Sequence, residues 1–323
     1  MFKEKDIRPD KIFDQYLELS KKDKIYFKKS NIFISCPACN KKTSKVFLFI
    51  KHGHKYNQCK TCETIYVSPR PSLSQLINYY RKSNSAKFFA DVFYKKTKKA
   101  RIEHLWKPKV DAIYDFIKDN KEKYAIYDIG GGYGIFADLF NKKFKKKVTV
   151  IEPDKTMYNH CVKKKIPAIN KFLENIKKED LKKEKKLFLS FELFEHLQSP
   201  NIFLKILKKI MSPGDIFIFT TLSSSGADIQ NLEINSKSFS IQHLNFFNPD
   251  SIVSLLNKHK FKVIKVETPG QLDIDILSKQ SNHIKNKLLK IMIKILSNKQ
   301  KKVLQKNLST ENLSSHMRVF CCV

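Results

Sequence analysis

The sequence predicts an α/β fold in which a mostly parallel sheet follows a small cysteine-rich module. Three observations support this prediction. From about residue 110 onwards, short apolar runs alternate with amphipathic segments, the pattern of a sheet covered by helices. The first of these apolar runs ends in a cluster of glycines, and two pairs of closely spaced cysteines lie within the first 62 residues.

The glycine cluster follows a short apolar segment, Tyr124–Ile129, which is rich in strand-forming residues. Gly130, Gly132 and Gly134 come next, and an amphipathic run then covers residues 133–140. Glycine lets a backbone approach a ligand closely, and the first turn of a helix offers unpaired N–H groups. This order of strand, turn and helix therefore predicts a site for a nucleotide-type ligand.

A second strand, residues 147–151, ends in an acidic residue, Glu152, roughly 20 residues after the glycines. A carboxylate at this place suits the two hydroxyl groups of an adenosine ribose. The glycine spacing G-G-G-Y-G differs from the G-x-G-x-x-G of dinucleotide-binding dehydrogenases. The pattern therefore favours another adenosine-containing ligand.

The segment Asp128-Ile-Gly-Gly-Gly-Tyr-Gly134 resembles the D-x-G-x-G-x-G motif of class I S-adenosylmethionine-dependent methyltransferases. The resemblance implies a Rossmann-like sheet of seven strands in the order 3-2-1-4-5-7-6, with the seventh strand antiparallel. It also implies S-adenosylmethionine as cofactor. The residues expected at the cofactor from this resemblance are Asp128, Gly130, Gly132, Gly134 and Glu152.

The cysteines form two C-x2-C pairs separated by nineteen residues. Each pair can present two thiolates from one tight turn, and a hairpin between the pairs would bring all four into a tetrahedron. The site would have no open position, so the zinc ion that it predicts is structural. The neighbouring His52 and His54 are expected to be surface residues. The predicted ligands are Cys36, Cys39, Cys59 and Cys62.

The segment 187–197 resembles the fourth strand of many small-molecule methyltransferases, which ends in E-x-x-E-H. Carboxyl ends of parallel strands face the ligand site, so Phe191 and Glu192 are expected near the methionine part of the cofactor. Glu195 and His196 are expected to begin the next helix. His196 suits either a general base or a backbone-bonded structural role.

A long polar segment, 222–240, leads into Gln242-His-Leu-Asn-Phe-Phe247, which resembles a segment of methyltransferases linked to surface polysaccharides and modified sugars. A histidine there could deprotonate a hydroxyl group or a carbon next to a carbonyl, because its pKa is near neutral pH. His243 is therefore a candidate catalytic base, with a structural hydrogen-bonding role as the alternative.

These patterns divide the chain into four parts. A polar N-terminal segment covers residues 1–32, and the zinc ribbon covers residues 33–70. A helical linker or lid follows at residues 71–109. The methyltransferase domain takes residues 110–323 and contains a helical insert at about 278–312.

The net charge of +32 invites a nucleic-acid partner. Only five of the 63 basic residues are arginine, and the lysines are spread along the whole chain. A nucleic-acid groove would be expected to concentrate its charge and to use more arginine. The charge is therefore interpreted as solvated lysine, although nucleic acid stays open as a partner.

The N-terminus is charged and lacks a signal-peptide core, and no run approaches the roughly 20 apolar residues of a membrane span. We therefore expect a cytoplasmic protein with reduced cysteines. Residues 281–308 form a basic amphipathic region that fits packing on the domain, a dimer contact or a membrane surface.

The sequence thus predicts methyl transfer from S-adenosylmethionine to oxygen or carbon of a sugar or another small polar acceptor, such as a nucleotide-sugar or glycan. One alternative is an RNA base methyltransferase that uses its zinc ribbon to bind RNA. A second is a non-catalytic binding protein on the same scaffold. The identity of the acceptor and the oligomeric state do not follow from the sequence.

Overall fold

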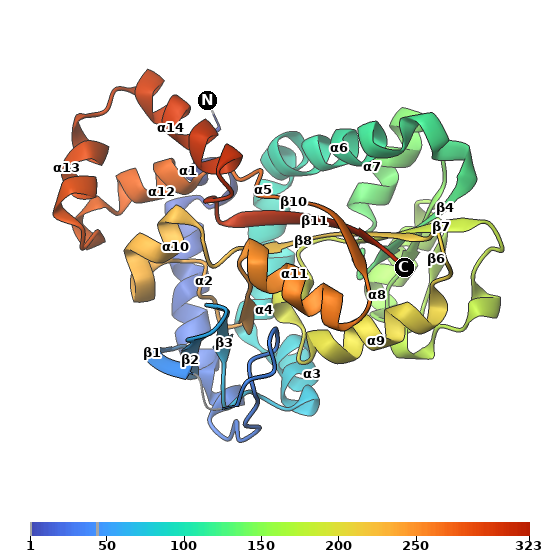
Figure 1. Ribbon diagram of the computed structural model, residues 1–323, viewed down its shortest axis with the longest axis horizontal. Coiled ribbons are helices and arrows are strands. Elements are labelled where there is room, and N and C mark those ends of the chain that lie inside the picture. The colour runs from blue at the N-terminus through green and yellow to red at the C-terminus, as the bar shows by residue number, and fades with distance from the viewer. Residues whose placement is uncertain (1, 43–44) are drawn as a thin grey trace.

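The computed structural model describes residues 2–42 and 45–323, and its centre is a sheet of seven strands (Figure 1). The spatial order is β6-β5-β4-β7-β8-β11-β10, which is 3-2-1-4-5-7-6 when these strands are counted along the chain. β11 runs antiparallel to both of its neighbours. The expected fold is therefore confirmed. The strands are β4 (Tyr124–Ile129), β5 (Val148–Ile151), β6 (Ala168–Ile169), β7 (Lys185–Ser190), β8 (Ile216–Leu222), β10 (Lys262–Glu267) and β11 (His316–Cys322).

Helices cover both faces of this sheet, and consecutive strand residues pack on opposite sides. Ile126 and Leu187 belong to the core under one set of helices, whereas Tyr127 and Phe188 belong to the core under the other. A sheet that is buried on both faces needs apolar residues at nearly every strand position, which explains the continuous apolar runs. The first set contains α6 (Lys107–Ile117), α7 (Ile135–Phe144) and α8 (Lys155–Lys163), and the second contains α9 (Pro200–Ile210) and α11 (Pro249–Lys258).

The connection from β7 to α9 differs from the prediction. Glu195 and His196 do not begin the next helix but lie in a short 3-10 turn, Phe194–His196. α9 begins only at Pro200, because the Ser199 side chain caps it by accepting from the Ile202 N–H, and proline suits the first helical turn.

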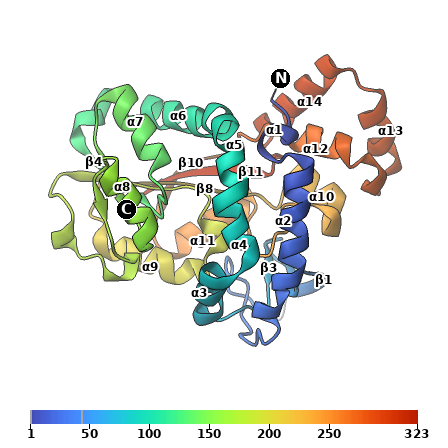
Figure 2. The same cartoon turned by 180° about the vertical axis from the view of Figure 1, so that it is seen from behind.

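The N-terminal segment is folded onto the helices of residues 71–109. In Figure 2, α2 (Asp10–Asp23) lies alongside α4 (Asn84–Phe88) and α5 (Tyr94–Arg101). The rings of Phe13 and Tyr16 pack against Phe93, with centroid distances of 5.7 and 6.2 Å. The segment therefore contributes a core of its own. The other helices of this region are α1 (Glu4–Ile7) and α3 (Leu73–Lys82).

A second, smaller sheet has the order β1-β2-β3-β9. Its first three strands are β1 (Lys45–Lys51), β2 (His54–Cys59) and β3 (Ile65–Val67), which belong to the cysteine module. Its fourth strand, β9 (Asn245–Phe246), comes from the far end of the segment that contains His243. The cysteine module and the main domain therefore share one sheet.

Arg70 reinforces this connection from a fully buried position. Its guanidinium donates to the Asn245 side-chain oxygen at 3.0 Å and also to the backbone carbonyl of Gln198. Its Nε donates to the carbonyl of Val67 at 3.3 Å. Three separate segments are thus tied to one side chain, which is buried with its hydrogen bonds satisfied.

The C-terminal helices follow β10 and precede β11, and they lie at one end of the molecule (Figure 1). They are α12 (Asp273–Lys279), α13 (Lys287–Ile295) and α14 (Asn298–Thr310), and α10 (Ala227–Leu232) packs on α12. Across the described residues, no helix has both the length and the apolar composition that a bilayer crossing requires.

Candidate functional site

The glycine turn between β4 and α7 leaves open space beside its backbone. Gly132 has a positive φ of 56°, and a Cβ built there would meet only the Met157 sulfur, at 3.7 Å. Gly131 is constrained differently, because a Cβ there would lie 2.6 Å from a carboxylate oxygen of Asp128. The turn can therefore keep its shape only with these glycines, and it presents bare backbone to a ligand.

Two acidic side chains lie under this turn. Asp128, at the end of β4, is buried, and its Oδ1 has no hydrogen-bond partner among the described residues. Glu152, just after β5, accepts from the backbone N–H of Gly132 at 3.0 Å and of Asp154 at 2.9 Å. A carboxylate has about four acceptor positions, so Glu152 keeps capacity for a ligand hydroxyl. Burial, with the nearby Glu152 charge, raises the pKa of Asp128 to about 8.

Phe191 and Glu192 follow β7 at the same edge of the sheet. Phe191 is buried against Phe136 and Trp106, with centroid distances of 4.7 and 6.1 Å. Glu192 has a positive φ of 54°, an uncommon conformation for a residue other than glycine. Leu193 then contacts the turn, since a Cβ on Gly130 would lie 3.0 Å from its side chain. The segment after β7 therefore adjoins the glycine turn.

The Glu192 carboxylate is held by two basic side chains that the sequence analysis missed, of which only the lysine is charged at neutral pH. Lys109 of α6 lies 3.0 Å away and His316 of β11 lies 3.6 Å away. The Thr220 hydroxyl donates to the same carboxylate at 2.8 Å. Burial opposes the charge, but Lys109 and His316 outweigh it and lower the pKa of Glu192. No local motif marks these partners, because they come from distant parts of the chain.

A second polar cluster consists of Glu195, His196 and His243. One possible ligand or proton-accepting atom from each lies within 4.8 Å of those of the other two. The imidazole rings have a centroid distance of 4.8 Å, and His196 Nε2 lies 3.9 Å from the Glu195 carboxylate. The tertiary structure therefore brings the two predicted histidines together, and it adds a carboxyl group.

Neighbouring groups orient each member of this cluster. His243 Nδ1 lies 2.6 Å from the Ser238 carbonyl, so it donates there and leaves Nε2 as the acceptor. His196 Nδ1 lies 3.2 Å from the Tyr80 hydroxyl, and Glu195 accepts from the Thr221 hydroxyl at 3.1 Å. Such partners fix the tautomer and the direction of each side chain.

Burial is the main cause of the shifted pKa values of the three side chains in this cluster. It lowers the pKa of His196 to about 3 and that of His243 to about 4. It raises the pKa of Glu195 to about 8, with a further contribution from the Glu192 charge. At neutral pH both histidines are therefore uncharged, and His243 has a free lone pair that can accept a proton.

The cysteine module sets the position of the His243 segment. The Tyr56 hydroxyl donates to the His243 carbonyl at 3.0 Å, and His54 Nε2 lies 2.8 Å from the Ile241 carbonyl. The expectation that His54 is a surface residue was wrong, because its side chain is fully buried in this contact. The segment of His243 is thus held by β2 through hydrogen bonds and by β3 through β9.

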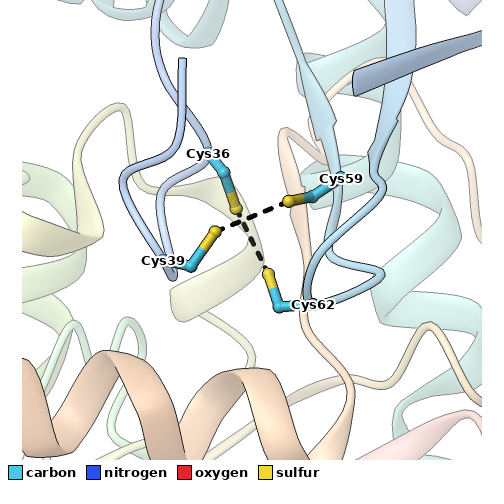
Figure 3. Close-up of side chains that lie close together, drawn as sticks. All are labelled: Cys36, Cys39, Cys59 and Cys62. Atoms are coloured by element: carbon cyan, nitrogen blue, oxygen red, sulfur yellow. Dashed lines mark hydrogen bonds between the residues drawn. The ribbon is translucent and has the colours of Figure 1, made fainter. Parts of the chain in front are cut away.

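The four predicted zinc ligands converge, as Figure 3 shows. The sulfur atoms of Cys36 and Cys62 are 3.5 Å apart, and so are those of Cys39 and Cys59. Zinc–sulfur bonds of about 2.3 Å in a tetrahedron place the sulfurs roughly 3.8 Å apart. The geometry and the donor type therefore fit a zinc ion bound by four thiolates.

Comparison with known proteins identifies one matching family. A profile of the family described as "Methyltransferase domain" matches residues 99–266, just over half of the chain. No curated protein matches the sequence significantly.

Several solved structures resemble the chain. One is an S-adenosylmethionine-dependent methyltransferase from Archaeoglobus fulgidus, with 14% identity and a TM-score of 0.47 over 71% of this chain and 100% of that one. The plantazolicin methyltransferase BamL has 15% identity and a TM-score of 0.49, over 77% and 94% of the two chains. A geranyl diphosphate C-methyltransferase from Streptomyces coelicolor A3(2) has 8% identity and a TM-score of 0.43. The match covers 71% of this chain and 83% of that one.

The partly buried histidines make stability depend on pH. His243 has a folded pKa of about 4, below the ordinary value near 6.5, so its contribution is complete above pH 6.5 and falls as pH drops towards 4. Between pH 7.0 and 5.5 this residue should cost at most about 1 kcal/mol of unfolding free energy. In urea unfolding, the free energy of unfolding of His243→Gln should change less between these two pH values than that of the wild type, by that amount. The exposed-site control His283→Gln should match the wild type, and an unchanged slope in His243→Gln would contradict the buried neutral imidazole.

Proposed function

The chain belongs to the methyltransferase-domain family, and we propose that it transfers a methyl group from S-adenosylmethionine to a sugar or another small polar acceptor. The family membership supports the methyl transfer, and the resemblance of residues 242–247 to sugar-linked methyltransferases supports the acceptor class. The observation that carries the cofactor assignment is the arrangement of Asp128, the glycine turn and Glu152. It combines an open backbone, an unpartnered buried carboxyl oxygen and a second carboxylate with spare acceptor capacity.

In this proposal Glu152 binds the ribose hydroxyls, and Gly130, Gly132 and Gly134 give the backbone its close approach to the cofactor. Asp128 lies beneath the turn and offers its free carboxyl oxygen. Glu192 and Phe191 flank the methionine part. The bound cofactor supplies an activated methyl group, so the protein needs to align the acceptor and, for some acceptors, to remove its proton.

We assign proton removal to the cluster of Glu195, His196 and His243. The free Nε2 of His243 makes it the first candidate for the base, with His196 the second. Glu195 is close enough to stabilise the positive charge that forms when a histidine takes up a proton. Its raised pKa keeps it protonated at neutral pH, and a positive charge on the neighbouring imidazole would favour its ionised form.

The cysteine cluster is proposed to bind one structural zinc ion, with Cys36, Cys39, Cys59 and Cys62 as ligands. Four thiolates complete a tetrahedron, so no position is left for water or substrate. In this interpretation residues 33–70 form the ribbon, residues 71–109 form a lid, and residues 110–323 form the catalytic domain with an insert near 278–312. The ribbon supports catalysis indirectly, by positioning the His243 segment.

Calorimetric titration tests the cofactor site. The wild type should bind S-adenosylmethionine and S-adenosylhomocysteine, and Glu152→Gln should weaken both about ten- to a hundredfold, because a charged hydrogen bond is worth roughly 1.5–3 kcal/mol. Glu179→Gln, which makes the same change at an exposed site, should leave affinity unchanged. A wild type that binds neither compound would overturn the cofactor assignment.

Metal analysis tests the zinc assignment. Protein purified without chelators should contain one zinc ion per chain by mass spectrometry, and Cys39→Ser/Cys62→Ser should contain almost none. Limited proteolysis should then cut residues 236–247 faster, since their anchor has loosened. Cys322→Ser serves as the control, because this residue lies on β11 and outside the cluster. Full zinc content in the double variant would refute the ligand set.

Radiolabelled methyl transfer tests the acceptor class. Label from S-adenosylmethionine should enter nucleotide-sugars or glycans, and His243→Gln should lower the rate by about 10²–10⁴-fold if it acts as the base. His283→Gln controls for loss of a histidine at an exposed site. Label that appears in RNA instead would support the alternative of an RNA base methyltransferase.

A further inference from the structure

Helix α13 exposes four large apolar side chains on one side. The exposed fractions are 68% for Leu288, 57% for Ile291, 37% for Met292 and 74% for Ile295. Spacings of three and four residues place these side chains together on one helical face. We call these four residues the α13 apolar face.

The opposite side of the helix holds it in place. Ile293 is buried and Leu289 is partly buried, and both join a core with residues of α10, α12 and α14. The Asn286 side chain caps the helix by accepting from the Leu289 N–H at 3.0 Å. The α13 apolar face therefore belongs to an anchored helix, and burying it within the insert would require this core to be broken.

Lysines border the α13 apolar face. Lys287, Lys290 and Lys294 lie on the arc between the exposed and the buried sides, and none has an ion-pair partner among the described residues. The whole stretch from residue 276 to 310 contains nine lysines and no aspartate or glutamate. The charge in this stretch is therefore one-sided, as it also is in residues 24–62.

Composition and charge identify what would cover this face. A second copy would bring its own lysines against these, and like charges repel. Protein-binding surfaces are enriched in aromatic residues and arginine, whereas the stretch 276–310 has neither. Aliphatic side chains beside lysines suit the boundary between acyl chains and anionic headgroups. The position of α13 at an outer end of the molecule leaves room for a flat partner (Figures 1 and 2).

We propose that α13 binds the surface of an anionic membrane. The α13 apolar face enters the headgroup–acyl boundary, and Lys287, Lys290 and Lys294 contact lipid phosphates. The helix lies parallel to the bilayer and does not cross it. The proposal does not depend on the acceptor or on methyl transfer.

Flotation of the full, zinc-replete chain with lipid vesicles tests this proposal at 150 mM salt. The wild type should float with vesicles of phosphatidylcholine and phosphatidylglycerol at 3:1, and much less with phosphatidylcholine alone. A triple substitution of the apolar face should reduce binding more than tenfold. Charge reversal of the bordering lysines should reduce vesicle binding at least as much, since each lysine near an anionic surface raises the affinity roughly fivefold. The two variants are Leu288→Gln/Ile291→Gln/Ile295→Gln and Lys287→Glu/Lys290→Glu/Lys294→Glu.

Matched controls separate a local site from the effect of net charge. The controls make the same changes at exposed residues elsewhere, as Ile25→Gln/Ile202→Gln/Ile264→Gln and Lys182→Glu/Lys183→Glu/Lys262→Glu. Both should bind vesicles like the wild type. Equal losses in test and control variants would overturn the proposal, because binding would then reflect general charge. A wild type that stays off vesicles, or that forms dimers broken by the apolar substitutions, would also overturn it.

Discussion

Parallel pairing of β4 with β5 and β7 is the constraint on which the rest of the molecule depends. It brings the carboxyl ends of these strands to one edge, so that Asp128, Glu152 and Glu192 become neighbours although 64 residues separate the first from the last. The glycine turn can then lie over two carboxyl groups. The buried apolar strands hold this edge rigid, which a site built from short polar side chains requires.

The cysteine module acts on the same edge from outside the main sheet. Strand β3 pairs with β9, and Arg70 ties both to the Gln198 carbonyl. A change in the cysteine module would therefore alter the surroundings of His243, whose backbone carbonyl accepts from Tyr56. If the module binds the proposed zinc ion, that ion would influence the chemistry without touching the substrate, because the module fixes a segment that otherwise has little regular structure.

The two groups of ionisable residues differ in how their charges are balanced. Glu192 is paired with the charged Lys109 and also lies 3.6 Å from His316, so its negative charge is stabilised. Among the described residues, Glu195, His196 and His243 form no ion pair with a lysine or an arginine, and burial pushes each towards its neutral form. The surroundings of Glu192 suit a permanent negative charge, whereas the cluster of Glu195, His196 and His243 suits proton transfer.

The sequence by itself determined the glycine turn with Asp128 and Glu152 and the cysteine pairs, because each depends on a local pattern of strand residues, glycine or C-x2-C. The sheet order followed only from the resemblance of the glycine motif to class I methyltransferases. The sequence also indicated His196 and His243, but as separate residues. Only the tertiary structure decided that they meet Glu195, that β9 extends the ribbon sheet and that His54 is buried. It also decided that the apolar residues of α13 stay exposed. These features arise from contacts between distant segments, and no local periodicity records which segments pack together.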